Sequence, residues 1–176
     1  AGPATDSVRS RQSELFQLVE KNDEARNKRI AALFDELLDY PSLAQASLGD
    51  HWAKLGEAEQ KEFTDLLTQL VRRSYEKNLR KTPAFNIEYL EEKPNADKQV
   101  VLVKTRAVHK TDKREEPITI DFSVQEREGK WRVRDIVTDD VSLVGSYRGQ
   151  FTRVIAKDGF PALIQKMKDK IAKGDV

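Results

Sequence analysis

The first 80 residues carry apolar side chains at the three- and four-residue spacing of amphipathic helices. Two short stripes, at residues 15–19 and 30–38, each predict a helix. Pro41 suits the first turn of a further short helix, which Gly49 ends. A long helix is predicted over residues 57–81, where the apolar positions share one face: Phe63, Leu66, Leu67, Leu70, Val71, Tyr75 and Leu79.

Between residues 85 and 138 the apolar period changes to two, which is the spacing of β-strands. Phe85, Ile87 and Tyr89 alternate with polar residues, and residues 100–103 are apolar on both faces. A third alternating stretch covers residues 118–125, and the pair Glu128-Gly129 predicts a tight hairpin into a fourth strand. Four strands joined by short turns predict an antiparallel meander.

Helical spacing returns after Asp140 in two runs separated by Gly159. Helices, then a meander, then helices predict an α+β fold with a four-stranded antiparallel sheet covered by N- and C-terminal helices. We expect a single domain over residues 10–172. Residues 1–9 are predicted to be a disordered N-terminal segment or a cloning scar.

Composition narrows the classes of function. The chain has 31 Lys and Arg against 30 Asp and Glu, so it lacks the strong basic excess that marks nucleic-acid binding. It has no cysteine for a disulfide or a thiolate metal site, and no apolar run of the roughly 20 residues that span a bilayer. The start at Ala1, without methionine, suits either a removed signal peptide or a trimmed clone.

Candidate chemistry is sparse. The sequence has no phosphate-binding glycine loop, no zinc-protease motif and no nucleophile elbow, and its two histidines, His51 and His109, lie in different segments, so no metal site is expected. Asp135 stands out, because strict alternation with Trp131 and Val133 points it inward. A buried carboxylate needs a partner, so Asp135 is interpreted as an ion-pair member or a cap on a backbone amide. The alternative is a general base in a cone-shaped cavity, as in enzymes of the ketosteroid isomerase kind.

The order of several short motifs resembles that of the MlaC, or toluene-tolerance, family over residues 10–170. The helical half contains Leu48-Gly49-Asp50-His51-Trp52, and the last strand contains Gly129-Lys130-Trp131 followed by Asp135-Ile136. Val141-Ser142, Tyr147-Arg148 and Gln150-Phe151 resemble the closing helices. Asp140 stands where the family usually has glycine, and aspartate tolerates the left-handed conformation better than most residues.

This resemblance implies a periplasmic carrier, exported with its signal peptide removed, that holds phospholipid acyl chains between sheet and helices. It implies two partners, an inner-membrane ABC-type transporter with lipid-binding domains and an outer-membrane lipoprotein–porin complex, in a system that maintains outer-membrane lipid asymmetry. No cofactor and no enzymatic step are implied, and a monomer is expected. A related branch is linked to hopanoids, so a hopanoid-type carrier remains an alternative.

The candidate lipid-binding residues are the apolar side chains expected to point inward. They come from the N-terminal helices, the inner face of the sheet and the closing helix: Phe34, Leu38, Leu67, Leu70, Val71, Tyr75, Phe85, Ile87, Val101, Val103, Ile120, Phe122, Trp131, Val133, Val141, Val144 and Phe151.

Overall fold

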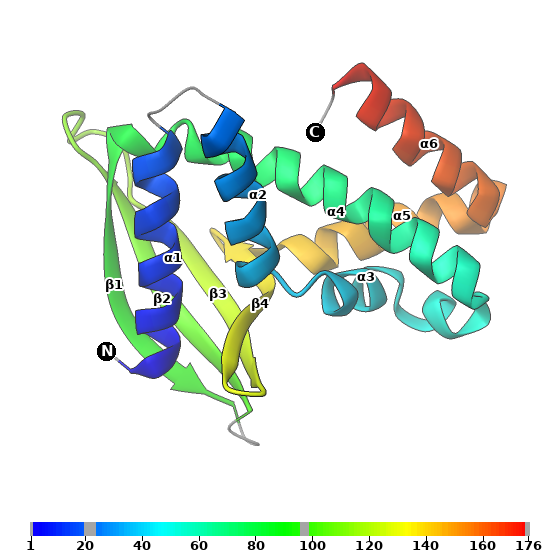
Figure 1. Ribbon diagram of the computed structural model, residues 1–176, viewed down its shortest axis with the longest axis horizontal. Coiled ribbons are helices and arrows are strands. Elements are labelled where there is room, and N and C mark those ends of the chain that lie inside the picture. Colours follow the sequence, from blue (N-terminus) through cyan, green and yellow to red (C-terminus); the bar gives the residue numbers. More distant parts are fainter. Residues whose placement is uncertain (1, 20–23, 96–98, 175–176) are drawn as a thin grey trace. The chain divides into compact units, whose positions relative to one another are not determined.

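The chain divides into two compact units in a computed structural model that describes residues 2–19, 24–95 and 99–174 (Figure 1). Unit 1 comprises residues 1–39 and 77–142, and unit 2 comprises residues 40–76 and 143–176. The chain therefore passes from one unit to the other three times. The single domain expected over residues 10–172 stays a prediction.

Unit 1 is built on an antiparallel sheet with the strand order β1-β2-β3-β4-β5. The four long strands confirm the predicted meander: β1 Phe85–Pro94, β2 Val100–His109, β3 Ile118–Arg127 and β4 Lys130–Thr138. The short fifth strand, β5 Val141–Ser142, was not predicted. It forms because Asp139 and Asp140, at φ 47° and 68°, turn the chain back along β4. The left-handed conformation expected of Asp140 is thus confirmed.

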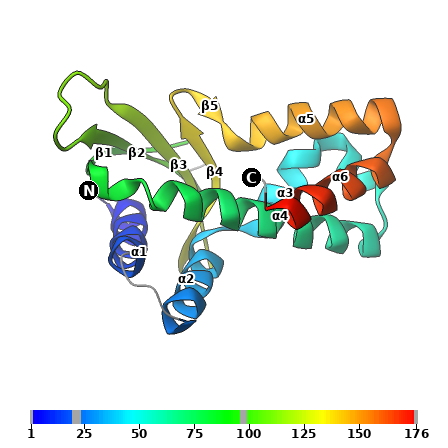
Figure 2. The same ribbon diagram turned by 90° about the horizontal axis from the view of Figure 1, so that it is seen from above.

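Helices α1 (Pro3–Val19) and α2 (Glu24–Leu37) cover one face of this sheet (Figure 2). At the end of α2, the backbone N–H of Asp39 donates to the carbonyl of Val133 on β4 at 2.8 Å. On α1, Gln12 accepts a hydrogen bond from the Tyr89 hydroxyl of β1 at 2.6 Å. We call the face that carries Tyr89 and Val133 the inner face. A short 3₁₀ helix, η2 (Thr82–Ala84), leads into β1.

Residues 3–9, which were expected to belong to a disordered segment or a cloning scar, form the first turns of α1 in the structure. The helix begins at Pro3, a residue favoured in a first helical turn, and it buries the side chains of Ala4 and Val8. The Glu92 carboxylate of β1 accepts a hydrogen bond from the Thr5 N–H at 2.6 Å. A carboxylate at a helix N-terminus also compensates the helix dipole. Residues 3–9 are therefore part of the folded unit.

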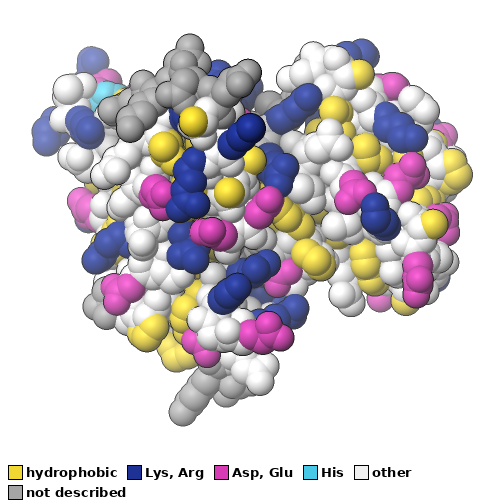
Figure 3. Space-filling model, in the orientation of Figure 1, with side chains coloured by type: hydrophobic (Ala, Val, Ile, Leu, Met, Phe, Trp, Pro, Cys, Tyr) yellow, Lys and Arg dark blue, Asp and Glu magenta, His cyan; other side chains and the backbone are white. Residues whose placement is uncertain are grey.

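Charges of both signs are interspersed over the surface that α1 and α2 present (Figure 3). Arg29 of α2 contacts Glu14 of α1 at 2.8 Å, and the hydrogen bond raises the pKa of the arginine. Arg11 lies 3.9 Å from Glu36. The Arg29–Glu14 pair is exposed and contributes little to stability, so burial of apolar side chains holds the helices on the sheet.

Unit 2 is helical, as predicted. It contains α3 (Tyr40–Leu48), the 3₁₀ helix η1 (Gly49–Lys54), most of α4 (Glu57–Leu79), α5 (Leu143–Asp158) and α6 (Phe160–Lys173). Phe63 of α4 meets Phe151 of α5 edge to face at a centroid distance of 5.5 Å. Arg148 of α5 donates to the Ala46 carbonyl of α3 at 2.8 Å. That the C-terminal helices cover the sheet stays a prediction.

Candidate lipid-binding site

The inner face of the sheet gathers apolar side chains from all four long strands. Residues paired across antiparallel strands point to the same face, so the register identifies its members. Val103 pairs with Phe122, and Val101 pairs with Val124, which pairs in turn with Val133. Thr105 pairs with both Tyr89 and Ile120, and Ala107 pairs with Ile87. The strand residues that were predicted to point inward therefore do share one face: Phe85, Ile87, Val101, Val103, Ile120, Phe122, Trp131 and Val133.

A β-bulge in β4 corrects the predicted place of Asp135. Val133 pairs with Val124, whereas Asp135 pairs with Ser123, so β4 has one extra residue between these pairs. The bulge breaks the strict alternation on which the prediction relied. It brings Ile136 opposite Phe122 on the inner face and leaves Asp135 on the other face.

The Asp135 carboxylate is satisfied by its immediate neighbours. One oxygen accepts from the Ile136 N–H at 2.8 Å, and the other accepts from the Ser142 hydroxyl of β5 at 2.6 Å. The bond from Ser142 links the two-residue β5 to β4, and a hydrogen bond to a charged group contributes about 1.5–3 kcal/mol. The geometry agrees with the interpretation of Asp135 as a backbone cap.

Most of the candidate residues of unit 1 are packed into its core. Phe34, Leu38, Val103, Phe122 and Val133 are each at most 2% exposed, and Val101 is 6% exposed. Four others keep some accessible surface on the inner face: Phe85, Ile87, Ile120 and Trp131. Val141, which was expected to point inward from the closing helix, lies on β5 and is 59% exposed.

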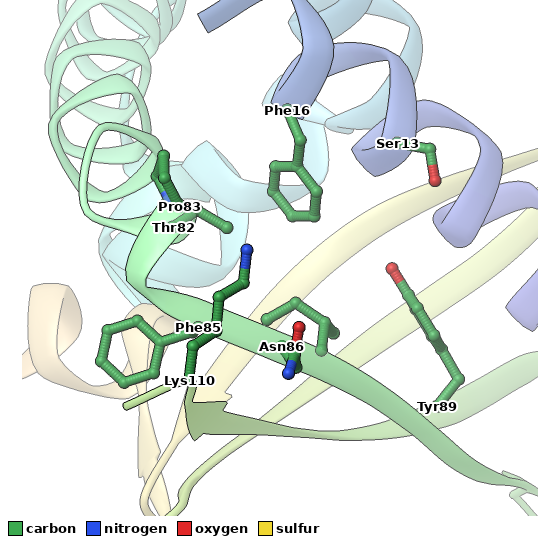
Figure 4. Close-up of a pocket in the computed structure, with 9 residues that line it drawn as sticks. Ser13, Phe16, Thr82, Pro83, Phe85, Asn86, Tyr89 and Lys110 are labelled. Carbon is green, nitrogen blue, oxygen red and sulfur yellow. The ribbon is translucent and has the colours of Figure 1, made fainter. Parts of the chain in front are cut away.

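An open cleft of about 300 Å³ lies between α1 and the first strand of unit 1 (Figure 4). Phe85 and Ile87 contribute to its apolar lining together with Phe16 of α1. Lys110, which follows β2, extends its amino group toward the space beside Phe16. The remaining lining residues supply hydroxyl, amide and ring groups: Ser13, Thr82, Pro83, Asn86 and Tyr89. The combination suits a ligand with an apolar body and a polar or anionic end.

The candidate residues of unit 2 lie on α4 and α5. Leu67, Leu70, Val71, Val144 and Phe151 are buried, whereas Tyr75 is half-buried. Leu70 and Phe151 also line a second cleft, formed by α4, α5 and α6.

Sequence reasoning missed the polar members of both clefts. Ser13, Asn86 and Lys110 come from three separate segments, and no motif links them. The paired lysines of the second cleft, Lys166 and Lys170, carry a weak signal, because residues four apart on a helix lie on one side.

The described residues contain no group of three or more His, Asp or Glu side chains placed to hold a metal ion. Among the helices described, none is long and apolar enough to cross a membrane.

Comparison with known proteins adds to this geometry. The chain resembles a phospholipid-binding protein from Ralstonia solanacearum, solved in complex with a phospholipid, with a TM-score of 0.82 and 22% sequence identity. The match covers 98% of this chain and 99% of the other, and at this identity it shows a shared fold. Among curated proteins, no sequence matches significantly. The family profile described as MlaC protein matches residues 4–169, nearly the full length, and the chain therefore belongs to the MlaC family.

Proposed function

We propose that this protein is a periplasmic phospholipid carrier whose residues 10–172 act as one lipid-binding domain. It binds acyl chains in its apolar interior and carries them between an inner-membrane lipid transporter and an outer-membrane lipoprotein–porin complex. The observation that carries this proposal is the match to the MlaC family over residues 4–169. The fold shared with a protein solved in complex with a phospholipid supports it. No cofactor and no chemical step are part of the proposal.

Hydrophobic transfer energies are consistent with a carrier. Two acyl chains hold about 30 methylene groups, each stabilised by about 0.8 kcal/mol when removed from water, so escape of the lipid into water is opposed by roughly 20 kcal/mol. Transfer between two apolar sites is nearly balanced, because both exclude water. Release therefore depends on docking to a partner that offers such a site.

The cost of an empty cavity favours a protein that rearranges on loading. One water molecule takes up about 30 Å³ in the liquid, and a methylene group is of similar size, so two chains need on the order of 900 Å³. The clefts measure about 300 and 200 Å³. A dry cavity of several hundred Å³ would cost roughly 10–20 kcal/mol, which rivals the stability of a whole domain. We therefore propose that the interior closes around its core residues when empty and opens when lipid enters.

Extraction of the purified protein tests the function directly. Chloroform–methanol extraction followed by mass spectrometry is expected to yield phospholipid in a fixed ratio to protein. The same protein, unfolded in denaturant and washed before refolding, should yield none and should take up phospholipid again from vesicles. A polycyclic triterpenoid in the extract would instead support the hopanoid alternative. Absence of any lipid, together with no uptake from vesicles, would falsify the carrier function.

The two tryptophans allow the proposed site to be located. Trp131 is a candidate lipid contact on the inner face, whereas Trp52 of η1 is not. In Trp52→Phe, Trp131 is the only tryptophan, and loading with phospholipid brominated on its acyl chains is expected to quench most of its fluorescence. Quenching requires contact between bromine and the indole ring, so it reports proximity to the chains.

The matched variant Trp131→Phe keeps only Trp52, and its emission should change little on loading with the same lipid. Unbrominated phospholipid serves as the reference for both variants. If lipid loads but Trp131 is not quenched, the inner face is not the acyl-chain site, although the protein is still a carrier.

A further inference from the structure

The second cleft, which lies wholly within unit 2, has an apolar floor and a basic rim. Leu70 of α4, Phe151 of α5 and Leu163 and Met167 of α6 form the floor, and each is at most 6% exposed. The Tyr147 ring forms part of the wall and stacks on Phe151 at a centroid distance of 5.2 Å and an interplanar angle of 6°. The floor excludes water and offers contact to hydrocarbon.

The charged residues at the rim of the cleft are two lysines. Lys166 and Lys170 lie one turn apart on α6, both line the cleft, and both are exposed. Within the described residues, neither lysine side chain has a hydrogen-bond or ion-pair partner, and no acidic side chain lines the cleft. The nearest lysine in sequence, Lys168, differs because it contacts Glu62 at 3.5 Å. Two unneutralised cations beside an apolar floor are complementary to an anion attached to hydrocarbon.

The end of α6 is held in place by a further cation. The Arg73 guanidinium of α4 donates a hydrogen bond to the Ile171 carbonyl in the last turn of α6. This bond satisfies a carbonyl group at the helix C-terminus and fixes the wall that carries Lys170. The Tyr147 phenol adds no negative charge to the cleft at neutral pH, and burial raises its pKa further.

The volume of the cleft limits the ligand. At about 30 Å³ per methylene, which is the volume that a water molecule takes up, a cleft of about 200 Å³ accepts on the order of seven methylenes. That is part of one chain, and the rest of a longer ligand would extend through the open side of the cleft.

We propose that the cleft between α4, α5 and α6 binds a single alkyl chain whose anionic head lies beside Lys166 and Lys170. The ligand class comprises fatty carboxylates, alkyl phosphates and lysophospholipids. The inference rests on the proposed function in taking lipids as the ligands, and it adds a site with its own chemistry. This site is distinct from the inner face of the sheet in unit 1.

Calorimetric titration with octyl phosphate, octanoate and neutral octyl glucoside tests the head group. Octyl phosphate and octanoate are expected to bind, and the double variant Lys166→Gln/Lys170→Gln should weaken both roughly tenfold, because each exposed ion pair contributes up to about 1 kcal/mol. The effect should shrink at high salt. The matched variant Lys157→Gln/Lys173→Gln removes the same charge outside the cleft and should bind as the parent does.

Chain length gives a second measurement that needs no variant. Affinity of alkyl phosphates should rise about fourfold per methylene and level off near eight carbons, when the cleft is full. A comparison of dodecanoate with lysophosphatidylglycerol then identifies the source of the anion. Equal binding of octyl glucoside, with no effect of the lysine change, would overturn the anionic class. No binding of any probe would overturn the site, and the proposed function would stand if phospholipid is still extracted and Trp131 still quenched.

Discussion

Phe63→Ala is expected to lower the free energy of unfolding by about 4 kcal/mol, because it removes the central ring of unit 2. Phe63 is fully buried, and its ring meets Phe151 edge to face at 5.5 Å and Phe160 at 6.4 Å. Removing a buried phenyl leaves a cavity and also eliminates aromatic contacts worth about 0.5–1.5 kcal/mol each. Urea unfolding followed by far-UV circular dichroism measures the change.

Phe160→Ala is the matched control within the same aromatic cluster. Its side chain is only half-buried at the start of α6, so less apolar surface is lost and a loss of about 1–2 kcal/mol is expected. Equal effects of the two substitutions would show that Phe63 is not the centre of the packing in unit 2.

Val133→Asp is expected to be the most damaging single change in unit 1, at about 5 kcal/mol or more. Val133 is fully buried on β4, where it pairs with Val124 and meets the end of α2 through Leu38. An aspartate there loses the apolar contacts and takes a carboxylate out of water, which costs several kcal/mol. That loss approaches the whole stability of a typical domain, so we expect an unfolded sheet at ambient temperature. Near-UV circular dichroism and proteolysis measure it.

Val141→Asp provides the control, since it makes the same chemical change at a residue that is 59% exposed. Its effect should lie within about 0.5 kcal/mol, as for most surface substitutions. Both valines were candidate lipid contacts. Comparing the two variants therefore also shows which of these two candidates is needed for the packing of the core. If Val133→Asp unfolds unit 1 while the helices of unit 2 keep their own transition, the prediction of one domain over residues 10–172 is wrong.

The sequence predicted the elements of the fold well where a single period dominates. The helical spacing of α4 and the alternation in β3 are each sustained over several turns or residues, so the boundaries fall within a few positions of the observed ones. The hairpin at Glu128-Gly129 was also predictable, and both residues adopt the positive φ that such a turn requires.

Two features of the fold were not predicted, because no local sequence pattern encodes them. The bulge in β4 depends on pairing with β3, and the residues Arg134 and Asp135 look like an ordinary alternating strand. The start of α1 was expected to be a disordered segment or a cloning scar, because the chain begins with Ala1-Gly2-Pro3-Ala4. Yet Ala4, Val8 and Leu15 are buried at helical spacing. Alanine and valine are small, so the apolar face of this helix is hard to recognise in the sequence.

The candidate site was predictable in part. Alternation correctly identified which side chains of β1 to β4 share a face, because pairing preserves parity along each strand outside a bulge. It did not separate residues that fill the core, such as Phe122, from residues that keep free surface, such as Ile87. That difference depends on which helix covers each position, which is a tertiary property.

The chain crosses between the two units three times, and this constrains the order in which they can fold during synthesis. Because unit 1 requires residues 77–142 and unit 2 requires residues 143–176, neither unit is complete until most of the polypeptide has emerged. Helices α3 and α4 are synthesised before their partners α5 and α6, so their apolar faces wait uncovered. We therefore expect these apolar faces to be prone to association until residues 143–173 have been synthesised.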